Sequence, residues 1–193
     1  MKKMWLRDVF NRITSYLVKP RVILGFTRYD GVYLQQTRIS NTSYIGNVDK
    51  LDIEDNVYVG HYCVLDCSNN IIIGEGCQLS THITIITHSS HNSIRLYGSH
   101  YIEHSPNLIG YIRGSVIIGR YSFIGAHATI MPGSKIGKGS IVGAYSLVKG
   151  EFPDYAIIAG NPARVIGDTR KQDQQYLDAN PELAKYYKEW SND

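Results

Sequence analysis

The chain has 193 residues, 43% of them hydrophobic, and a formal net charge of +3. This length suits one hydrophobic core, and the mild charge, with no run of more than two Lys or Arg residues, argues against nucleic-acid binding. The three cysteines form no even disulfide framework and suit a reducing compartment, so we expect a cytoplasmic protein.

Residues 1–25 are predicted to form an N-terminal helical segment. Apolar side chains recur there at helical spacing, at Trp5, Leu6, Val9, Phe10, Ile13, Tyr16 and Leu17. We expect this helix to pack on the first coil of the domain that follows or on a neighbouring subunit. A helix lying on a membrane surface is the alternative. Charged residues break any signal-peptide core, and no run is long enough to span a membrane, so membrane contact should be peripheral at most.

Most of the chain follows a six-residue repeat. Aliphatic residues recur every six positions at Ile118, Ile124, Ile130, Ile136, Val142 and Val148, and earlier blocks run through Ile53, Val59 and Leu65 and through Ile73, Leu79 and Ile85. A period of six fits neither an amphipathic helix nor a hairpin sheet. It predicts an all-β solenoid of short strands, with the aliphatic residue inside, a small residue such as Ser122 where space narrows, and a glycine or polar residue turning each corner.

The repeat is interrupted between residues 86 and 117, and we expect a protruding loop at about 87–113. Four of the seven histidines lie in this stretch, namely His88, His91, His100 and His104. A long insertion in a compact chain is more often functional than not. The reference pKa of histidine, about 6.5, suits a general base near neutral pH.

The remaining segments complete a predicted organisation of three parts. Residues 1–25 form the helical segment, residues 26–167 form the solenoid with its insertion at 87–113, and residues 168–193 form a C-terminal helical tail. In this tail Asn180, Pro181 and Glu182 read as the N-cap, first position and acidic first turn of a short helix. That helix would carry Leu183, Tyr186, Tyr187 and Trp190 as packing residues.

The repeat and the segment "IGAHATIMPGSKIGKGSIVGAYSLVKGEFPDYAIIAGNPARVIG" at 124–167 resemble the hexapeptide-repeat acyltransferases. The resemblance covers residues from about 50 to 167. It is nearest to the sugar O-acetyltransferase branch, with its galactoside, maltose, nodulation and capsule acetyltransferases. It implies a left-handed parallel β-helix, a homotrimer, and acetyl-CoA bound between adjacent subunits, with no metal. The N-terminal sugar-binding segment of the maltose and galactoside enzymes is not recognisable here, which leaves the acceptor open.

The resemblance also implies roles for particular residues. The backbone N–H of Ala126 would face the thioester carbonyl and stabilise the oxyanion. The backbone of Gly143 and Ala144 would bind the pantetheine arm, and Arg164 would lie near the nucleotide end of the coenzyme.

The lysine expected to contact the coenzyme phosphates is displaced. After the last inner valine the family often has Thr-Lys-Asp, whereas this chain has Lys149-Gly150-Glu151. Lys149 is therefore one candidate, and Lys138 and Lys135 are substitutes, since coenzyme A carries several phosphate charges. An ordinary solvated turn lysine is the alternative for each.

The family places a histidine just after the inner aliphatic residues, a second one three residues later and an arginine seven residues later. His88, His91 and Arg95 reproduce this spacing. The first histidine is the base in the family, so we predict His88 as the general base, with His91 as the alternative. A base usually has a partner that orients its other ring nitrogen. The candidates for this partner are Asp66, Ser89 and Glu103.

The resemblance therefore implies an acetyl-CoA-dependent O-acetyltransferase that acts directly on a saccharide hydroxyl, such as that of a cell-surface polysaccharide precursor. A covalent acyl-enzyme is not expected, because Cys63 and Cys77 fall at inward packing positions. N-acetylation of an amino-sugar nucleotide is the main alternative. A γ-carbonic-anhydrase-like zinc enzyme using His82, His100 and His104, or a non-catalytic solenoid, are further alternatives.

Overall fold

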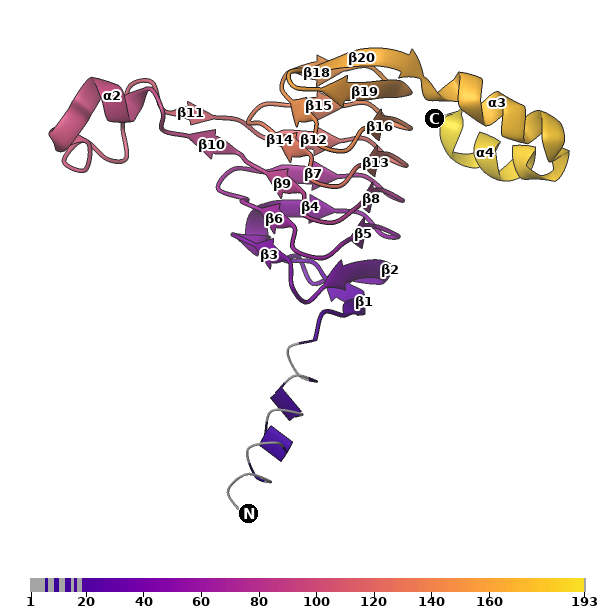
Figure 1. Ribbon diagram of the computed structural model, residues 1–193, viewed down its shortest axis with the longest axis horizontal. Helices are drawn as coiled ribbons and strands as arrows, with labels where there is room; N and C mark the ends of the chain where they lie inside the picture. Colours follow the sequence, from indigo (N-terminus) through magenta and orange to yellow (C-terminus); the bar gives the residue numbers. More distant parts are fainter. Residues whose placement is uncertain (1–5, 7–8, 11–12, 15, 17–18, 193) are drawn as a thin grey trace.

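The computed structural model describes residues 6, 9–10, 13–14, 16 and 19–192. Short parallel strands wind into a three-sided solenoid, with an arm projecting from one side and a helical hairpin from the other (Figure 1). The prediction of an all-β solenoid is confirmed, because the strands of successive coils pair in parallel at matching positions of the repeat, as Ile130 does with Ile85 and Val148.

Three sheets form the sides of the solenoid in the described part of the chain. Sheet A contains, in order, β1 (Val22–Thr27), β2 (Tyr33–Ser40), β5 (Tyr58–Val59), β8 (Gln78–Leu79), β13 (Phe123–Ile124), β16 (Ile141–Val142), β19 (Ala156–Gly160) and β20 (Ala163–Asp168). Sheet B contains β17 (Leu147–Val148), β14 (Thr129–Ile130), β9 (Thr84–Ile85), β6 (Val64–Leu65) and β3 (Tyr44–Ile45). Sheet C contains β18 (Glu151–Phe152), β15 (Lys135–Ile136), β12 (Val116–Ile118), β7 (Ile71–Ile73) and β4 (Leu51–Ile53), the last following η1 (Val48–Lys50).

The sheets meet at three corners, which position the functional residues. The AB corner comprises residues 60–63, 80–83, 125–128 and 143–146. The BC corner comprises residues 46–50, 66–70, 131–134 and 149–150, and the arm leaves it after residue 86. The CA corner comprises residues 54–57, 74–77, 119–122, 137–140 and 153–155.

The six-residue repeat supplies the core. Its aliphatic residues from Ile118 to Val148 are all at most 2% exposed. The small residues between them are buried at the corners, where serine hydroxyls satisfy backbone carbonyls: Ser122 donates to the Gly137 oxygen at 3.0 Å and Ser134 to the Met131 oxygen at 2.7 Å. Like residues therefore stack from coil to coil, which makes the core continuous.

Glycine or polar residues do have left-handed backbone at the corners, but the glycines directly after the aliphatic residues do not. Gly125 is not among the residues with positive φ, and a Cβ on it would lie 2.6 Å from the Ala144 nitrogen. Its role is to let the next coil approach. At the AB corner the left-handed positions are held by rings, with φ of 57° at Tyr62, 58° at His82 and 60° at His127. At the other corners glycines such as Gly76, Gly133 and Gly139 hold them. Such φ values are uncommon for residues with a side chain.

Replacing Ile124 with alanine is expected to lower the free energy of unfolding by about 2–5 kcal/mol, because it leaves a cavity in a core that cannot collapse around it. The neighbouring Phe123 in β13 is the matched control, since it is 45% exposed whereas Ile124 is fully buried. Urea unfolding followed by circular dichroism measures both. Equal losses for the two variants would contradict this account of the core.

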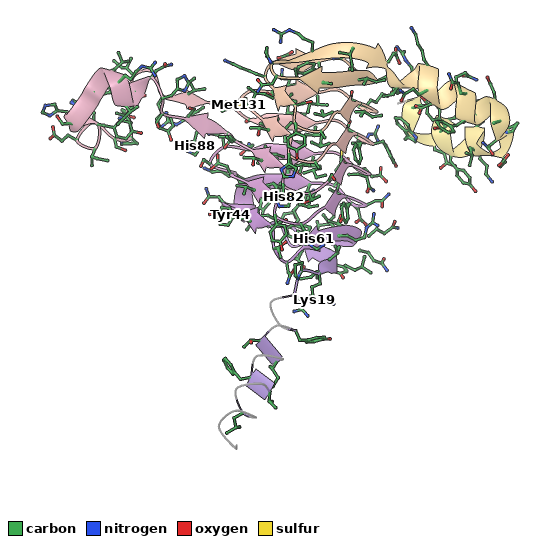
Figure 2. The ribbon with its side chains drawn as sticks, in the orientation of Figure 1. Lys19, Tyr44, His61, His82, His88 and Met131 are labelled. Atoms are coloured by element: carbon green, nitrogen blue, oxygen red, sulfur yellow. The ribbon has the colours of Figure 1, made fainter. Side chains whose placement is uncertain are left out.

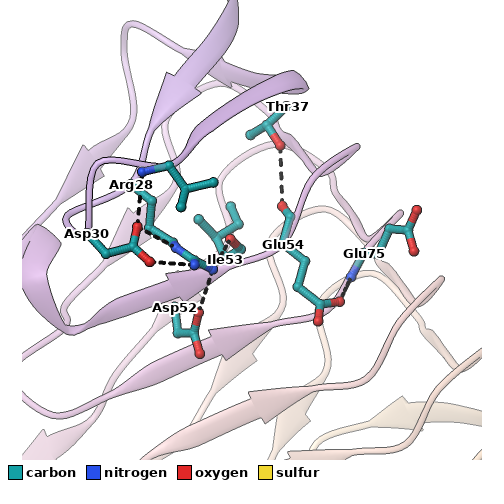
Figure 3. Close-up of polar contacts among 8 residues, drawn as sticks. Arg28, Asp30, Thr37, Asp52, Ile53, Glu54 and Glu75 are labelled. Atoms are coloured by element: carbon teal, nitrogen blue, oxygen red, sulfur yellow. Dashed lines mark hydrogen bonds and ion pairs between the residues drawn. The ribbon is translucent and has the colours of Figure 1, made fainter.

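The β1–β2 hairpin closes the N-terminal end of the solenoid. Arg28 forms ion pairs with Asp30 at 2.5 Å and Asp52 at 3.2 Å (Figure 3). In the next coil Glu54 accepts a hydrogen bond from the Glu75 nitrogen at 2.7 Å. The hairpin begins at Val22, so the last residues of the segment 1–25 are strand.

The predicted N-terminal helix is described only in part. Leu6, Phe10, Ile13 and Tyr16 have helical backbone, and their side chains are 54–72% exposed in this single chain. Trp5 and Leu17, with the basic residues Lys2, Lys3, Arg7 and Arg12, lie outside the described residues. Within the described residues no helix has the length and hydropathy needed to cross a membrane.

The C-terminal tail is a helical hairpin of α3 (Thr169–Ala179), η3 (Pro181–Leu183) and α4 (Ala184–Ser191). The Asp168 side chain accepts from the Arg170 nitrogen and caps α3. Asn180 precedes η3 with Pro181 at its start, but its side chain donates to the Tyr176 carbonyl at 2.9 Å instead of capping the next helix. Both helices lie within the predicted helical tail at 168–193, although sequence signals were assigned only to the helix after Asn180.

Candidate functional site

His88 lies where the arm leaves the solenoid. It begins β10 (His88–Ser89), which pairs antiparallel with β11 (Ile112–Arg113) at the base of the arm. The two strands fix the backbone of His88 at the BC corner, next to β9 of sheet B. Its side chain is 35% exposed, so it is held by the protein and still reachable by a ligand.

The His88 ring is held by Asp66 from the coil below. His88 Nδ1 lies 2.8 Å from Asp66 Oδ2. An ionised carboxylate can only accept, so Nδ1 carries the hydrogen and Nε2 of the neutral ring keeps its lone pair. This is the arrangement of a base whose second nitrogen is oriented by an acid.

Asp66 is prepared for this role by its own hydrogen bonds. Its Oδ2 accepts from the Thr87 hydroxyl at 2.7 Å and the Thr87 nitrogen at 3.0 Å, and its Oδ1 accepts from Ser68 at 2.7 Å. Burial alone would raise the pKa of Asp66, but these hydrogen bonds outweigh it and hold the pKa well below its ordinary value. Asp66 is therefore ionised at neutral pH.

A glycine one coil below Asp66 leaves room for the Asp66 backbone. A Cβ on Gly46 would lie 2.1 Å from the Asp66 carbonyl oxygen. The backbones at this corner touch, and only glycine fits beneath Asp66.

The three candidate orienting residues contact three different histidines. Ser89 Oγ lies 2.7 Å from His91 Nδ1, and Glu103 Oε2 lies 3.0 Å from His100 Nδ1. Of these three candidates, Asp66 is the one that contacts His88. A hydroxyl orients a ring without adding charge, so His91 lacks the electrostatic support that His88 has.

The arm packs around His88 with aromatic and basic groups. The Tyr111 ring is stacked on the His88 ring at 5.8 Å with an interplanar angle of 2°, and the Arg113 guanidinium lies 4.3 Å from the centre of the Tyr111 ring. Farther out, in α2 (Ser93–Tyr97) and η2 (Gly98–His100), Arg95 donates to Asn92 at 2.7 Å and the Tyr97 hydroxyl accepts from the Ile109 nitrogen at 3.1 Å. These last two contacts hold the arm together.

Ala126, Gly143 and Ala144 lie on neighbouring coils of the AB corner. The Tyr145 nitrogen donates to the Ala126 oxygen at 3.0 Å, and the Gly143 nitrogen donates to the Ile158 oxygen at 2.8 Å. Within the described part of the chain, no group accepts a hydrogen bond from the Ala126 or Ala144 nitrogen. These two N–H groups are thus available to a ligand.

The basic residues predicted to bind the coenzyme are spread over three places. Arg164 follows the β19–β20 turn opposite Ala159, next to the AB corner, and is exposed. Lys149 is exposed at the BC corner. Lys138 lies at the CA corner, where its Nζ donates to the Ser191 carbonyl at 3.2 Å. Lys135 pairs with Glu151 in sheet C at 2.9 Å. Of these, only Arg164 lies beside Ala126 and Ala144 in one chain.

His88 and Ala126 lie at opposite edges of sheet B. His88 follows β9, whereas Ala126 precedes β14, and these strands pair in parallel with Thr84 opposite Thr129. Figure 2 shows the same separation between His82, at the AB corner, and His88 at the base of the arm. A single chain therefore does not bring the predicted base to the predicted oxyanion N–H.

The other histidines have structural partners. At the AB corner the His82 ring stacks on His127 at 4.7 Å, and His127 stacks on Tyr145 at 4.8 Å. On the arm His104 contacts the Tyr97 ring at 4.8 Å. The three histidines of the zinc-enzyme alternative are therefore apart in one chain, with His82 on the solenoid and His100 and His104 on the arm. The described residues contain no group of three His, Cys, Asp or Glu placed to hold a metal ion within one chain.

The cysteines are buried packing residues. All three are free, and burial raises the pKa of Cys67 to about 11 and that of Cys77 to about 12. The Cys77 sulfur contacts the Gly119 carbonyl at 3.1 Å. A thiol that stays protonated is a poor nucleophile, which agrees with direct transfer.

The sequence reasoning missed Thr87 and Tyr111 and left Asp66 as one of three candidates. Counting coils would have helped with Asp66, because Leu65 pairs with Ile85 and so places Asp66 directly below Ile86. Tyr111 carried no usable signal, since its contact with His88 depends on how the arm folds back.

Residues 115–150 match the family model described as bacterial transferase hexapeptide (six repeats). The chain is 40% identical over 91 residues to YvoF of Bacillus subtilis strain 168, described as an acetyltransferase; this covers 47% of the chain and 52% of YvoF. It is 41% identical over 66 residues to WbbJ of Escherichia coli K12, described as a lipopolysaccharide biosynthesis O-acetyl transferase, covering 32% of the chain and 34% of WbbJ. The chain thus spans about half the length of YvoF and about a third of WbbJ.

Solved structures agree on the fold. A maltose O-acetyltransferase from Clostridium difficile 630 superposes with a TM-score of 0.55 at 23% identity, covering 66% of this chain and 64% of that one. A variant of AntD, an N-acyltransferase from Bacillus cereus in complex with dTDP-4-amino-4,6-dideoxyglucose and coenzyme A, superposes with a TM-score of 0.53 at 25% identity, covering 75% and 89%. The predicted left-handed parallel β-helix is confirmed.

Proposed function

The chain carries the hexapeptide repeats of the bacterial transferases, and its relatives are described as acetyltransferases, so we propose that it transfers an acetyl group from acetyl-CoA to a saccharide hydroxyl. The observation that carries this proposal is the His88–Asp66 pair, at 2.8 Å, on the same sheet whose other edge bears unpaired backbone N–H groups. A base and an oxyanion donor are the two groups that acyl transfer to a hydroxyl requires.

The proposed reaction is a direct transfer. Nε2 of His88 takes the proton of the acceptor hydroxyl as its oxygen attacks the thioester carbonyl carbon. The Ala126 N–H donates to the developing oxyanion. The carbon–sulfur bond then breaks, and the sulfur takes the proton from His88, giving coenzyme A and an acetyl ester. Asp66 stabilises the imidazolium formed on the way.

This proposal requires a second copy of the chain. His88 and Ala126 lie at opposite edges of sheet B, so one site needs His88 of one subunit and Ala126, Gly143, Ala144 of another. A closed ring in which every subunit offers both edges of sheet B satisfies this requirement, and a homotrimer is the ring we propose. Arg164 would then lie on the coenzyme side of each site.

Mixed oligomers are expected to regain activity that each parent lacks. His88→Ala removes the base, and Ala144→Trp, at an exposed position, blocks the coenzyme side. In trimers that contain both variants, about one third of the sites combine an intact His88 with an intact groove. Co-expression with two affinity tags and a coenzyme A release assay measures this. If mixed oligomers stay inactive while each variant still folds and assembles, the shared site is wrong.

An acetyl-CoA screen across saccharide acceptors tests the reaction itself. We expect coenzyme A release that depends on the acceptor and a product heavier by one acetyl group. Mild base should remove that group, because an ester is far more labile than an amide. Purified Asp66→Asn protein serves as the matched control for background hydrolysis. A product that resists base would overturn O-acetylation.

N-acetylation of an amino-sugar nucleotide is the second candidate. The AntD variant, whose fold this chain shares, is described in complex with an amino-sugar nucleotide and coenzyme A. A base would again be useful there, since the attacking ammonium must first lose a proton. The base stability of the product in the screen separates the two candidates.

A further inference from the structure

A hollow lies at the CA corner, away from the residues of the proposed reaction. It is a cavity of about 580 Å³ between this corner and the helical hairpin. Glu75 and Tyr121 line it from the solenoid, and Asp173, Tyr187 and Trp190 line it from α3 and α4. A volume of this size falls in the range of small-molecule sites.

Aromatic rings form much of its wall. The Trp190 ring lies 4.9 Å from Tyr121, tilted by 30°, and 5.1 Å from Tyr187, nearly edge-on at 68°. Tyr176 and Tyr186 complete the rim and are 68% and 55% exposed, so the cavity opens to solvent on that side. Aromatic rings set at different angles thus line one open hollow, and an aromatic face is the part of a ring that attracts a cation.

The charged groups at the wall are mainly acidic. Glu75, Asp173 and Glu189 line the cavity, and Arg120 is the only basic residue among those that line it. Burial raises the pKa of Asp173. Burial and the nearby negative charge of Asp173 together raise the pKa of Tyr187 to about 12. A positive charge in the cavity would relieve the cost of keeping Asp173 ionised there.

Rings at and beside the cavity already attract cations from their own chain. The Lys185 ammonium lies 4.5 Å from the Tyr186 ring centre, and the Arg170 guanidinium lies 4.9 Å from that of Tyr155. Tyr155 in turn lies 6.0 Å from Trp190. These are the distances of cation–π contacts.

We propose that this cavity binds a small organic ammonium ion, with its charge facing the carboxylates and its hydrocarbon body against the rings of Tyr121, Tyr187 and Trp190. Aromatic faces combined with carboxylates select such ions over neutral molecules of the same shape. The site does not depend on acetyl transfer, because the CA corner carries neither His88 nor Ala126.

Trp190 supplies the probe for a direct test. The chain has two tryptophans, so a Trp5→Phe protein reports on Trp190 alone. Choline is titrated against this protein at constant ionic strength, with its chloride replacing sodium chloride. We expect a saturable change in Trp190 emission. The uncharged isostere 3,3-dimethylbutan-1-ol should require at least about tenfold more for the same change, because it lacks the charge.

Charge variants decide whether the carboxylates act. Glu189→Gln in the same background is expected to weaken choline binding by about three- to tenfold. Glu182→Gln, an exposed residue of η3 that does not line the cavity, should leave binding unchanged. Thermal melting confirms that both variants fold. No saturable change, an equal response to the isostere, or equal binding by both variants would each overturn the proposal.

Discussion

Replacing His88 with alanine is expected to lower kcat/KM for acetyl transfer by roughly 10²- to 10⁴-fold, the contribution typical of general-base catalysis. The variant removes the nitrogen that takes the acceptor proton and leaves the Ala126 corner untouched. Because His88 is 35% exposed, the loss of its ring should leave the core intact. Coenzyme A release at saturating acetyl-CoA measures the effect, and thermal melting shows whether the protein still folds.

His91→Ala is the matched control for His88→Ala. His91 lies three residues farther along the same arm, and its Nδ1 lies 2.7 Å from the Ser89 hydroxyl, with no carboxylate to orient it among the residues that the structure describes. We expect a much smaller loss of activity for this variant. A large loss for His91→Ala combined with normal turnover of His88→Ala would reverse the assignment, and normal turnover in both would end it.

Asp66→Asn is expected to lower kcat on the order of 10²-fold while changing KM little. An amide cannot stabilise an imidazolium as a carboxylate does, and it can present an N–H to the Nδ1 of His88 and so favour the wrong tautomer. Asp66 touches no reacting atom in the proposed reaction, so it is a positioning residue.

Two readouts separate positioning from a general loss of structure at Asp66. Nitrogen NMR of the His88 ring should show that in Asp66→Asn the hydrogen moves from Nδ1 to Nε2. If the substitution only destabilised this corner, the protein that remains folded would keep its hydrogen on Nδ1. Ser68→Ala, which removes only the 2.7 Å hydrogen bond to Oδ1, is the mild control. If Asp66→Asn keeps both the wild-type tautomer and the wild-type kcat, Asp66 has no positioning role.

The six-residue repeat could be read directly, because each aliphatic residue must face inward for a coil to close. Every member of the series from Ile118 to Val148 is buried, and Cys63 and Cys77 lie at the inward positions that the repeat assigned to small residues. The position of the arm could be read for the same reason, since the series Ile73, Leu79, Ile85 finds no aliphatic residue at its next position, His91.

The sequence could not decide which residue orients the His88 ring. Their spacing in the sequence did not distinguish Asp66, Ser89 and Glu103 as partners of the His88 ring. Asp66 is the partner because it lies one coil below Thr87, to which it is hydrogen-bonded at 2.7 Å. Contacts between coils are set by how the chain winds. The residues concerned are 21 positions apart in the sequence, so no local pattern records their contact.

The repeat therefore determined by itself the solenoid, its inward residues and the place of the arm, because burial of one aliphatic residue per side is a local and periodic requirement. Tertiary structure alone decided that the glycines after the aliphatic residues allow coils to touch, that rings occupy the left-handed positions of the AB corner, and that Asp66 contacts the His88 ring. It also decided that His88 and Ala126 lie on opposite edges of one sheet. Each of these depends on which coils become neighbours, and that depends on how the chain winds, which no local pattern records.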